Sequence, residues 1–360
     1  MNKKISIFCG ILFFLGLLGQ TQARGRDEVH RYTLLRDRTL IEREIKHGLN
    51  SYRYNHYFDL DLLIADGTRE MITDIKNGID DADNQLEKTT NVLNILNKNM
   101  NSEKYVNLQA SVGIPLPYIK IEELKILPSL FVSQNFGIMT SIDNQNDPTN
   151  PKAQIYFKTD TKYGLATRYK WREDHEFRTS IYQLLRSDLS AKRTAVDIVD
   201  KGELSDFSEL SDEQKALGID FSYIKQNGQS TYLLEILELF PGEATNSDTK
   251  TRYGMKPLFH ARYSRKYASS AWTWHPFVGI HLRQHYGLVD AFYAGTTLKL
   301  DRDIPFQLAF KMSNQFLTLI PAFSTQYFQL NYSFKTPYIN PQDDIWVSAH
   351  HTLNIRFPFP

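Results

Sequence analysis

The sequence predicts an all-β protein: an antiparallel transmembrane β-barrel of about 12 to 14 strands with an N-terminal amphipathic helical segment. Three observations predict this class. From about residue 105 onward, apolar and polar side chains alternate with a period of two, in segments of roughly 8 to 12 residues. Aromatic residues are abundant (22 Phe, 20 Tyr and 4 Trp), and many stand near the ends of these segments. The chain also begins like an exported protein.

Residues 1–23 have the features of a secretory signal peptide. Lys3 and Lys4 precede an apolar stretch from Ile5 to Leu18, and Ala23 is a small residue at a plausible cleavage point. The chain has one cysteine, which excludes a disulfide scaffold, and cleavage there would remove it. No later stretch approaches the ~20 apolar residues that a spanning helix needs. The mature chain can therefore span a membrane only as a barrel.

Residues 24–103 form an N-terminal segment that precedes the predicted barrel at 104–360. Residues 24–63 are mixed and charged and have no clear pattern. Residues 68–100 predict one long helix, because apolar residues recur every three or four positions. The stripe includes Ile72, Ile75, Ile79, Leu86, Leu93 and Leu96. Its other faces are acidic, so we expect the helix to plug the barrel, to pack elsewhere on the protein, or to bind a partner in the periplasm.

Eight segments carry the clearest alternation between an apolar and a polar face. They are 106–114, 163–171, 259–263, 278–282, 292–300, 306–312, 328–334 and 353–359. The connections are short at 301–303 and 314–315 and long at 143–152, 187–215 and 242–253, as in a membrane barrel. A soluble sandwich also alternates, but it would bury Phe306, Phe310, Leu330 and Phe334 in a dry interior.

The last strand carries a resemblance to a known class of proteins. Its apolar positions are Leu353, Ile355, Phe357 and Phe359. With the signal peptide, this strand resembles the closing strand of bacterial outer-membrane β-barrel proteins, although Phe359 is followed by Pro360. The resemblance implies the outer membrane of a Gram-negative bacterium and recognition by the barrel-assembly machinery. The acid-rich helix also resembles, more loosely, TraF-type and fatty-acid-transporter-like barrels.

Basic residues dominate the polar face that we expect to line the lumen. They include Arg168, Lys170, Arg172, Arg262, His281, Arg283, Lys299, Lys311 and Arg356. Acidic residues are expected mainly in turns and loops. A basic wall would favour anions, unless acids from loops or the helix fold in, pair with these bases and plug the barrel.

No motif predicts a cofactor, a metal site or an enzyme. With 42 Lys+Arg against 41 Asp+Glu, the chain is nearly neutral, which argues against nucleic-acid binding through bulk charge. The expected role is passive passage or binding of small solutes, anionic ones included. One alternative is a structural barrel that docks a partner through helix 68–100. Another is an ester or phospholipid hydrolase that uses Ser348 and His350 of the last strand.

Overall fold

The structure is a computed structural model that describes residues 28–358 with short gaps. The gaps are 48–52, 144–149, 173, 205–208, 211–212, 240–255, 270–271, 284–285, 301–305 and 341–344. The predicted signal peptide at 1–23 and the terminal Phe359 lie outside the described residues.

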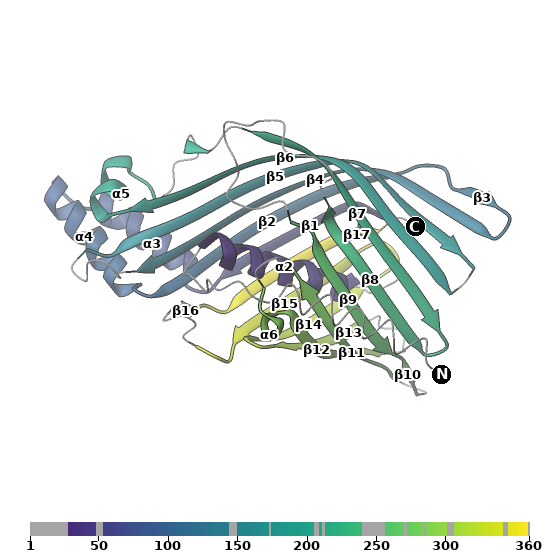
Figure 1. The fold of residues 1–360 in the computed structure, drawn as a ribbon. Coiled ribbons are helices and arrows are strands. Elements are labelled where there is room, and N and C mark those ends of the chain that lie inside the picture. The colour runs from purple at the N-terminus through teal and green to yellow at the C-terminus, as the bar shows by residue number, and fades with distance from the viewer. Residues whose placement is uncertain are drawn as a thin grey trace.

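One closed ring of fourteen antiparallel strands forms the body of the protein (Figure 1). Its strands are β1 (His56–Ala65), β2 (Ser102–Pro115), β4 (Leu124–Asp143), β5 (Lys152–Trp171), β6 (His175–Arg193), β7 (Gln214–Asn227), β8 (Ser230–Leu239), β9 (Leu258–Arg265), β11 (Trp272–Leu282), β12 (Phe292–Leu300), β13 (Phe306–Ser313), β14 (Phe316–Ser324), β15 (Gln329–Pro337) and β17 (His350–Pro358). Short strands β3 (Ile119–Ile121), β10 (Tyr267–Ala268) and β16 (Trp346–Val347) extend their neighbours.

Strand β1 closes the barrel, because it pairs with both β2 and β17. The number of strands agrees with the expected range and is even. The barrel begins at His56, however, well before the boundary predicted at residue 104. This first strand escaped the sequence analysis because its alternation of apolar and acidic residues is short, from Phe58 to Leu62, and gives way to an unbroken apolar run that ends at Ala65.

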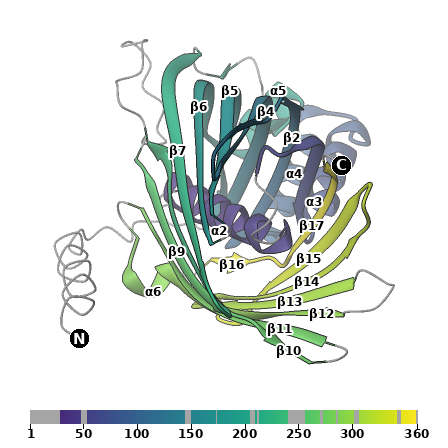
Figure 2. The ribbon, with the colours of Figure 1, turned by 90° about the vertical axis from the view of Figure 1, so that its right-hand side faces the viewer.

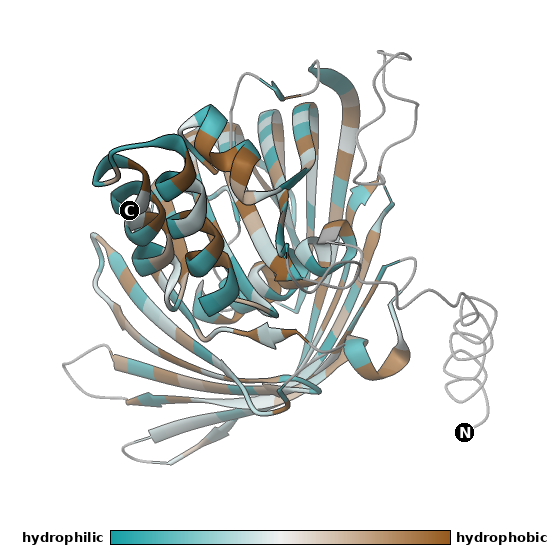
Figure 3. Ribbon diagram, turned by 90° about the vertical axis from the view of Figure 1, so that its left-hand side faces the viewer, coloured by the Kyte–Doolittle hydropathy of each residue, from teal (hydrophilic) through white to brown (hydrophobic). Residues whose placement is uncertain are grey.

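Side chains alternate between an apolar outer face and a polar inner face, and Figure 3 shows this alternation as bands along the strands. Phe306, Phe310 and Leu330 are 37%, 41% and 40% exposed on the outside of the ring, so they do not form a dry interior between two sheets. Next to Phe310 on the same strand, Lys311 faces inward and is buried. The apolar partner of this barrel is therefore lipid, and the prediction of a membrane barrel is confirmed.

The two ends of the barrel differ. At one end, tight turns join β5 to β6 and β7 to β8, and β17 finishes there; we call this the short-turn end. At the other, the long-loop end, the connections include helices. Exposed aromatic residues stand near both ends, as in interfacial girdles: Trp171, Tyr232, Tyr267, Trp272 and Trp274 near the short turns, and Tyr338 and Trp346 near the long loops.

Among the residues that the structure describes, five helices accompany the strands. They are α2 (Glu28–His47), α3 (Thr68–Asp80), α4 (Gln85–Lys98), α5 (Ala195–Lys201) and α6 (Leu288–Ala291). Within the described residues, none combines the length and apolarity that crossing a bilayer requires. Seen along the barrel, α2 lies inside the ring of strands (Figure 2).

The predicted helix at 68–100 is two helices, α3 and α4, so the prediction of a single apolar stripe along it is wrong. The chain turns at residues 81–84, where the Asn84 side chain accepts a hydrogen bond from the backbone of Glu87 and caps α4. Ile75, Ile79 and Leu96 of the stripe are buried, and Leu93 is partly buried. Ile72 and Leu86, by contrast, are 53% and 78% exposed. The second helix turns a different face inward, because the break changes the helical phase. Met71 and Val92 complete the buried set.

Helices α3, α4 and α5 form a helical cap on the outer face of the long strands (Figure 1). Strands β4, β5 and β6 have 20, 20 and 19 residues, longer than the predicted 8 to 12, and run past the rest of the barrel at the long-loop end. Ile142 of β4 and Ile155 of β5 share one apolar cluster with Ile198 of α5. The extra strand length therefore provides the platform on which the cap packs.

Candidate functional site

Helix α2 fills the lumen and is held there mainly by charge. Its first turns pack beside Ala65 and Tyr105 at the long-loop end, while Glu44 reaches Arg178 toward the short-turn end. The ion pairs between α2 and the wall are Arg31–Glu103, Arg36–Glu238, Asp37–Arg283, Glu42–Lys311, Glu42–Lys335, Arg43–Asp59 and Glu44–Arg178. Both α2 and the wall therefore contribute positive and negative side chains to these ion pairs.

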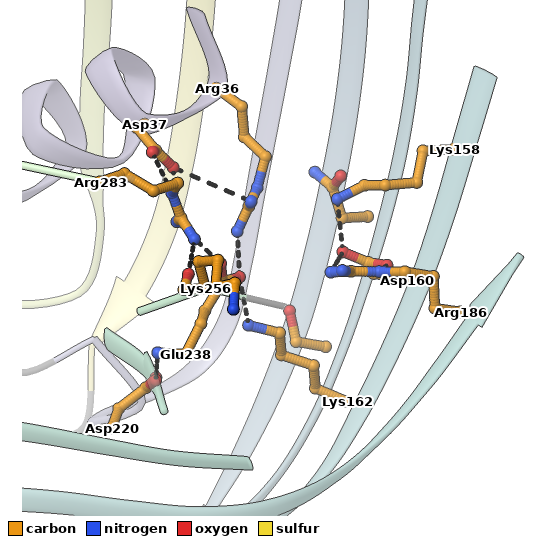
Figure 4. A network of polar contacts seen from close by, with 12 residues as sticks. Arg36, Asp37, Lys158, Asp160, Lys162, Arg186, Asp220, Glu238, Lys256 and Arg283 are labelled. Carbon is orange, nitrogen blue, oxygen red and sulfur yellow. Dashed lines mark hydrogen bonds and ion pairs between the residues drawn. The ribbon is translucent and has the colours of Figure 1, made fainter. Parts of the chain in front are cut away.

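The centre of this network is drawn in Figure 4. Arg283 donates to both carboxylate oxygens of Asp37, over 2.7 and 3.0 Å, and to Glu238 Oε2 over 2.9 Å. Arg36 of α2 also bonds Glu238, and Lys162 lies 3.2 Å from it. Glu238 sits in an irregularity of the β7–β8 pairing with a φ of 58°. This bulge brings its carboxylate into the lumen, next to the inward-facing Leu237.

A second cluster lies deeper in the wall, on β5 and β6. Arg186 binds Asp160 through two hydrogen bonds of 2.5 and 2.8 Å, and Lys158 bonds the same carboxylate over 2.7 Å (Figure 4). All three side chains are buried. Their mutual pairing offsets the cost of removing them from water.

One acid of α2, Glu42, forms ion pairs with two lysines of the wall. Glu42 Oε1 lies 2.8 Å from Lys311 Nζ, and Glu42 Oε2 lies 3.0 Å from Lys335 Nζ. Thr318 donates to the same carboxylate over 3.3 Å. Every one of these side chains is buried, so Glu42 is the group that neutralises this part of the wall.

Apolar contacts also hold α2. Tyr32 packs edge-on against Tyr105 and Tyr156, with ring centroids 5.6 and 4.9 Å apart. Ile41 and Ile45 join a cluster with residues of β11 to β14. A cavity beside α2, lined by Arg36, Arg43, Tyr54 and other residues, holds about 40 Å³, room for roughly three water molecules at the ~10–15 Å³ that each needs. Beside α2, this cavity is therefore too small for a solute much larger than water.

Most of the bases predicted for the lumen lie on its wall. Arg168, Arg262, His281, Arg283, Lys311 and Arg356 are buried on the inner face. Lys170 is half-buried, Lys299 is exposed near the short-turn end, and Arg172 lies in a turn, exposed, beside Glu123. That these residues face a solute stays a prediction.

Acidic residues are also plentiful inside, contrary to the expectation that they gather in turns and loops. Those buried on the wall include Asp59, Asp61, Glu103, Asp160, Asp220, Glu235 and Glu238. The wall is therefore mixed in charge. Several of these acids lie on strands, or parts of strands, that the alternation did not reveal.

The predicted pair of Ser348 and His350 does not assemble. His350 is buried in the lumen against the rings of Tyr105 and Phe316. Ser348 accepts a hydrogen bond of 3.0 Å from Lys104 instead. In the part of the chain that the structure describes, no group of three or more His, Cys, Asp or Glu side chains is arranged to hold a metal.

On the closing strand β17, Leu353, Ile355 and Phe357 alternate outward while Asn354 and Arg356 point into the lumen. Arg356 lies beside Asp59 of β1, 3.7 Å away. This is the arrangement expected of a closing strand, whereas recognition by an assembly machinery stays a prediction.

The sequence analysis did not find α2, which is the main component of the site. Two signals were present: residues 28–47 contain no Gly or Pro, and Leu34, Ile41 and Ile45 lie on one helical face. The dense charges around them concealed that stripe, because a helix in a polar lumen does not need a broad apolar face.

No protein-family model and no curated protein matches this sequence. Among solved structures, the TodX deltaS2S3 mutant monoaromatic hydrocarbon channel gives a TM-score of 0.47 at 9% identity, covering 87% of this chain and 93% of that chain. The beta domain of the Bordetella autotransporter BrkA gives 0.39 at 7% identity, covering 85% and 100%. A mutant of Rh. blastica porin gives 0.35 at 8% identity, covering 85% and 99%. These likenesses add no argument about solute or mechanism. The narrower resemblance to TraF-type barrels stays a prediction. The strand pairings themselves give the chain the architecture of bacterial outer-membrane β-barrels.

Proposed function

We propose that the protein is a gated outer-membrane barrel, through which small polar solutes pass when α2 shifts within the lumen. The observation that carries this proposal is the nature of the contact between α2 and the wall. It consists largely of ion pairs between polar surfaces, such as Asp37–Arg283 and Glu42–Lys311. Such surfaces can be rehydrated on either side when they separate, whereas an apolar plug would leave apolar walls facing water.

The wall that α2 covers supports passage of polar solutes in general. Displacement of α2 would remove the ion-pair partner of Lys311 and Lys335 on the wall, and it would also remove the partner of Glu103. Because both signs are released, we expect only weak preference between anions and cations. Passage of anions remains part of the proposal, without a dominant basic wall.

The orientation of the barrel follows from a general property of bacterial outer-membrane barrels, whose short turns face the periplasm and whose long loops face outward. By that rule, the short-turn end, where β17 finishes, faces the periplasm. The helical cap then lies on the outer side of the cell. This orientation disfavours the predicted role of residues 68–100 in binding a periplasmic protein.

Single-channel recording in planar bilayers tests the gate. The intact protein should remain mostly closed. Asp37→Asn, which weakens the hold of Arg283 and Tyr286 on α2, should raise the fraction of time spent open. Removal of residues 28–47 should give a steadily conducting barrel. Heat-modifiable gel migration verifies that each variant still forms a barrel.

A matched control lies in the cap. Asp200 of α5 accepts a hydrogen bond from Gln85 of α4, outside the lumen and exposed. Asp200→Asn should leave conductance unchanged. A folded barrel without residues 28–47 that still does not conduct would reject the gate and favour a purely structural barrel.

One observation favours a second function, a docking barrel. Leu86 of α4 and Val196 of α5 are 78% and 50% exposed, on two helices that the Gln85–Asp200 bond joins. Replacement of both by Ser should abolish such docking without affecting conductance, which separates it from the gate.

A further inference from the structure

Three lysines stand in one row across the inner wall at the short-turn end. Lys120 of β3 is directly opposite Lys125 of β4, and Lys125 is directly opposite Lys170 of β5. Like charges placed directly opposite each other destabilise a sheet. With strands about 4.8 Å apart, the row spans roughly 10 Å.

Of the described acids around this row, Glu176 and Glu123 are held by arginines, while Glu122 forms no ion pair within 4 Å among the described residues. Glu176, the next residue in the row, bonds Arg168 and Arg178 over 2.7 and 2.6 Å. Glu123 pairs with Arg172, and Asp174 lies 3.3 Å from His175. Among the ion pairs within 4 Å that the described residues form, none includes Lys120, Lys125 or Lys170.

The row lines an open cavity of about 580 Å³ at the short-turn mouth of the barrel. That volume is within the usual range of small-molecule sites, about 300–1,000 Å³. Two residues that border it, Glu122 and Arg172, have positive φ angles of 50° and 58°. Residues other than glycine adopt such angles at some energetic cost, and that cost often accompanies a functional site.

We propose that this cavity is a binding site for a small polyanion that carries about three negative groups, and that Lys120, Lys125 and Lys170 are its main ligands. A ligand of this kind would give these three lysines the direct anionic contacts that no ion pair within 4 Å among the described residues provides. Carboxylates and phosphates share the required chemistry, since both accept charge-assisted hydrogen bonds from ammonium groups. An elongated ligand fits the row better than a monoanion, because its charges can face successive lysines.

This site goes beyond the proposed gate and does not require α2 to move. Arg178, which holds Glu176, also pairs with Glu44 of α2, so the cavity and the seated plug are compatible. Binding with no conductance, or conductance with no binding, would distinguish failure of one proposal from failure of the other.

Isothermal titration of the full-length protein in a nonionic detergent tests the site, with citrate, tripolyphosphate and acetate as ligands. We expect citrate or tripolyphosphate to bind and acetate to show no measurable binding. Citrate and tripolyphosphate each carry three anionic groups, and the one that binds more strongly identifies the carboxylate or phosphate source. Lys125→Gln should weaken binding about tenfold, because it removes the central charge-assisted contact. Lys125→Arg should retain binding.

The matched control is Lys225 of β7, which is opposite His175 at the same rim but faces the outside of the barrel. Lys225→Gln should bind as the unchanged protein does. Glu123→Gln, which releases Arg172, should strengthen binding. The proposal is overturned if neither citrate nor tripolyphosphate binds, if Lys125→Gln has no effect in a variant that keeps its heat-modifiable migration, or if Lys225→Gln weakens binding equally.

Discussion

Helix α2 in the lumen and the helical cap on the outer wall both pack against the strands, but α2 does so with charged residues and the cap with apolar ones. The cap buries an apolar set, including Met71, Val92 and Leu96, against apolar residues of the long strands. Helix α2 instead buries charged residues, among them Arg38, Asp37 and Glu42, against a charged wall. The surface that a helix contacts therefore decides which residues the helix must present. The cap packs on apolar strands and needs an apolar stripe, while α2 packs on a charged wall and needs matched charges.

The comparison predicts unequal responses to mutation. Apolar packing loses stability in proportion to the atoms removed. A charge network loses most when one member is removed and the others remain buried without a partner.

The largest effect is expected at Glu42. Glu42→Leu leaves Lys311 and Lys335 buried without their acid, which should destabilise the seating of α2 by about 3–5 kcal/mol. Hydrogen exchange of the α2 amides measures this as lost protection. The triple variant E42L/K311M/K335M should recover most of the protection, since the charges are removed together. If the triple variant is no better than the single one, the loss does not come from the two orphaned lysines, which contradicts this prediction.

In the cap, Leu96→Ala should cost about 2–5 kcal/mol, because it leaves a void beside Val92 and Ile155. Limited proteolysis at residues 81–84 should accelerate, while protection of α2 in the lumen should not change. Leu86→Ala, at a position 78% exposed, is the matched control and should have no effect. Loss of protection in α2 would show that the cap and α2 are coupled, which would contradict the view that they are held independently.

A steric change can unseat α2 without touching a charge. Gly137 of β4 lies under Tyr32, and a Cβ added there would come within 2.2 Å of the Tyr32 hydroxyl oxygen. Gly137→Ala should therefore weaken the seating of α2 by about 1–3 kcal/mol. Adding Tyr32→Phe should relieve part of this loss. Equal hydrogen exchange in the Gly137→Ala variant and the unchanged protein would mean that the ring does not pack there.

The smallest effect is expected at the start of α5. Thr194 and Asp197 form a capping box there, and Thr194→Ala should cost about 1 kcal/mol. Hydrogen bonds from the Thr194 backbone and side chain lower the pKa of Asp197. Because the pKa is lower in the folded state, this contribution is present above the unfolded pKa of about 3.9 and is lost as the pH falls below it. Proteolysis of the cap as a function of pH measures the effect, and Asp197→Asn should remove that dependence.

The outer surface of the barrel could be predicted from sequence because lipid imposes one simple rule on it. Most outward positions along the strands are apolar, so Phe306, Phe310 and Leu330 were assigned to the correct face. The same rule placed the alternating apolar residues of β17 outside.

The site could not be predicted to the same extent, because its contacts join distant parts of the chain. Arg36 and Glu238 are separated by 202 residues, and Asp37 and Arg283 by 246. No local period connects such residues. A lumen that accepts charge also removes the apolar signal on which helix prediction depends, which is why α3 and α4 were found as a helical region and α2 was not.

The short connection between α2 and β1 has a consequence for any opening of the barrel. Helix α2 ends at His47 and β1 begins at His56, so residues 48–55 tether one to the other and can reach at most about 30 Å. A displaced α2 therefore stays near the mouth at an effective concentration on the order of millimolar. Reclosure is an intramolecular event whose rate does not depend on how many copies of the protein the membrane holds.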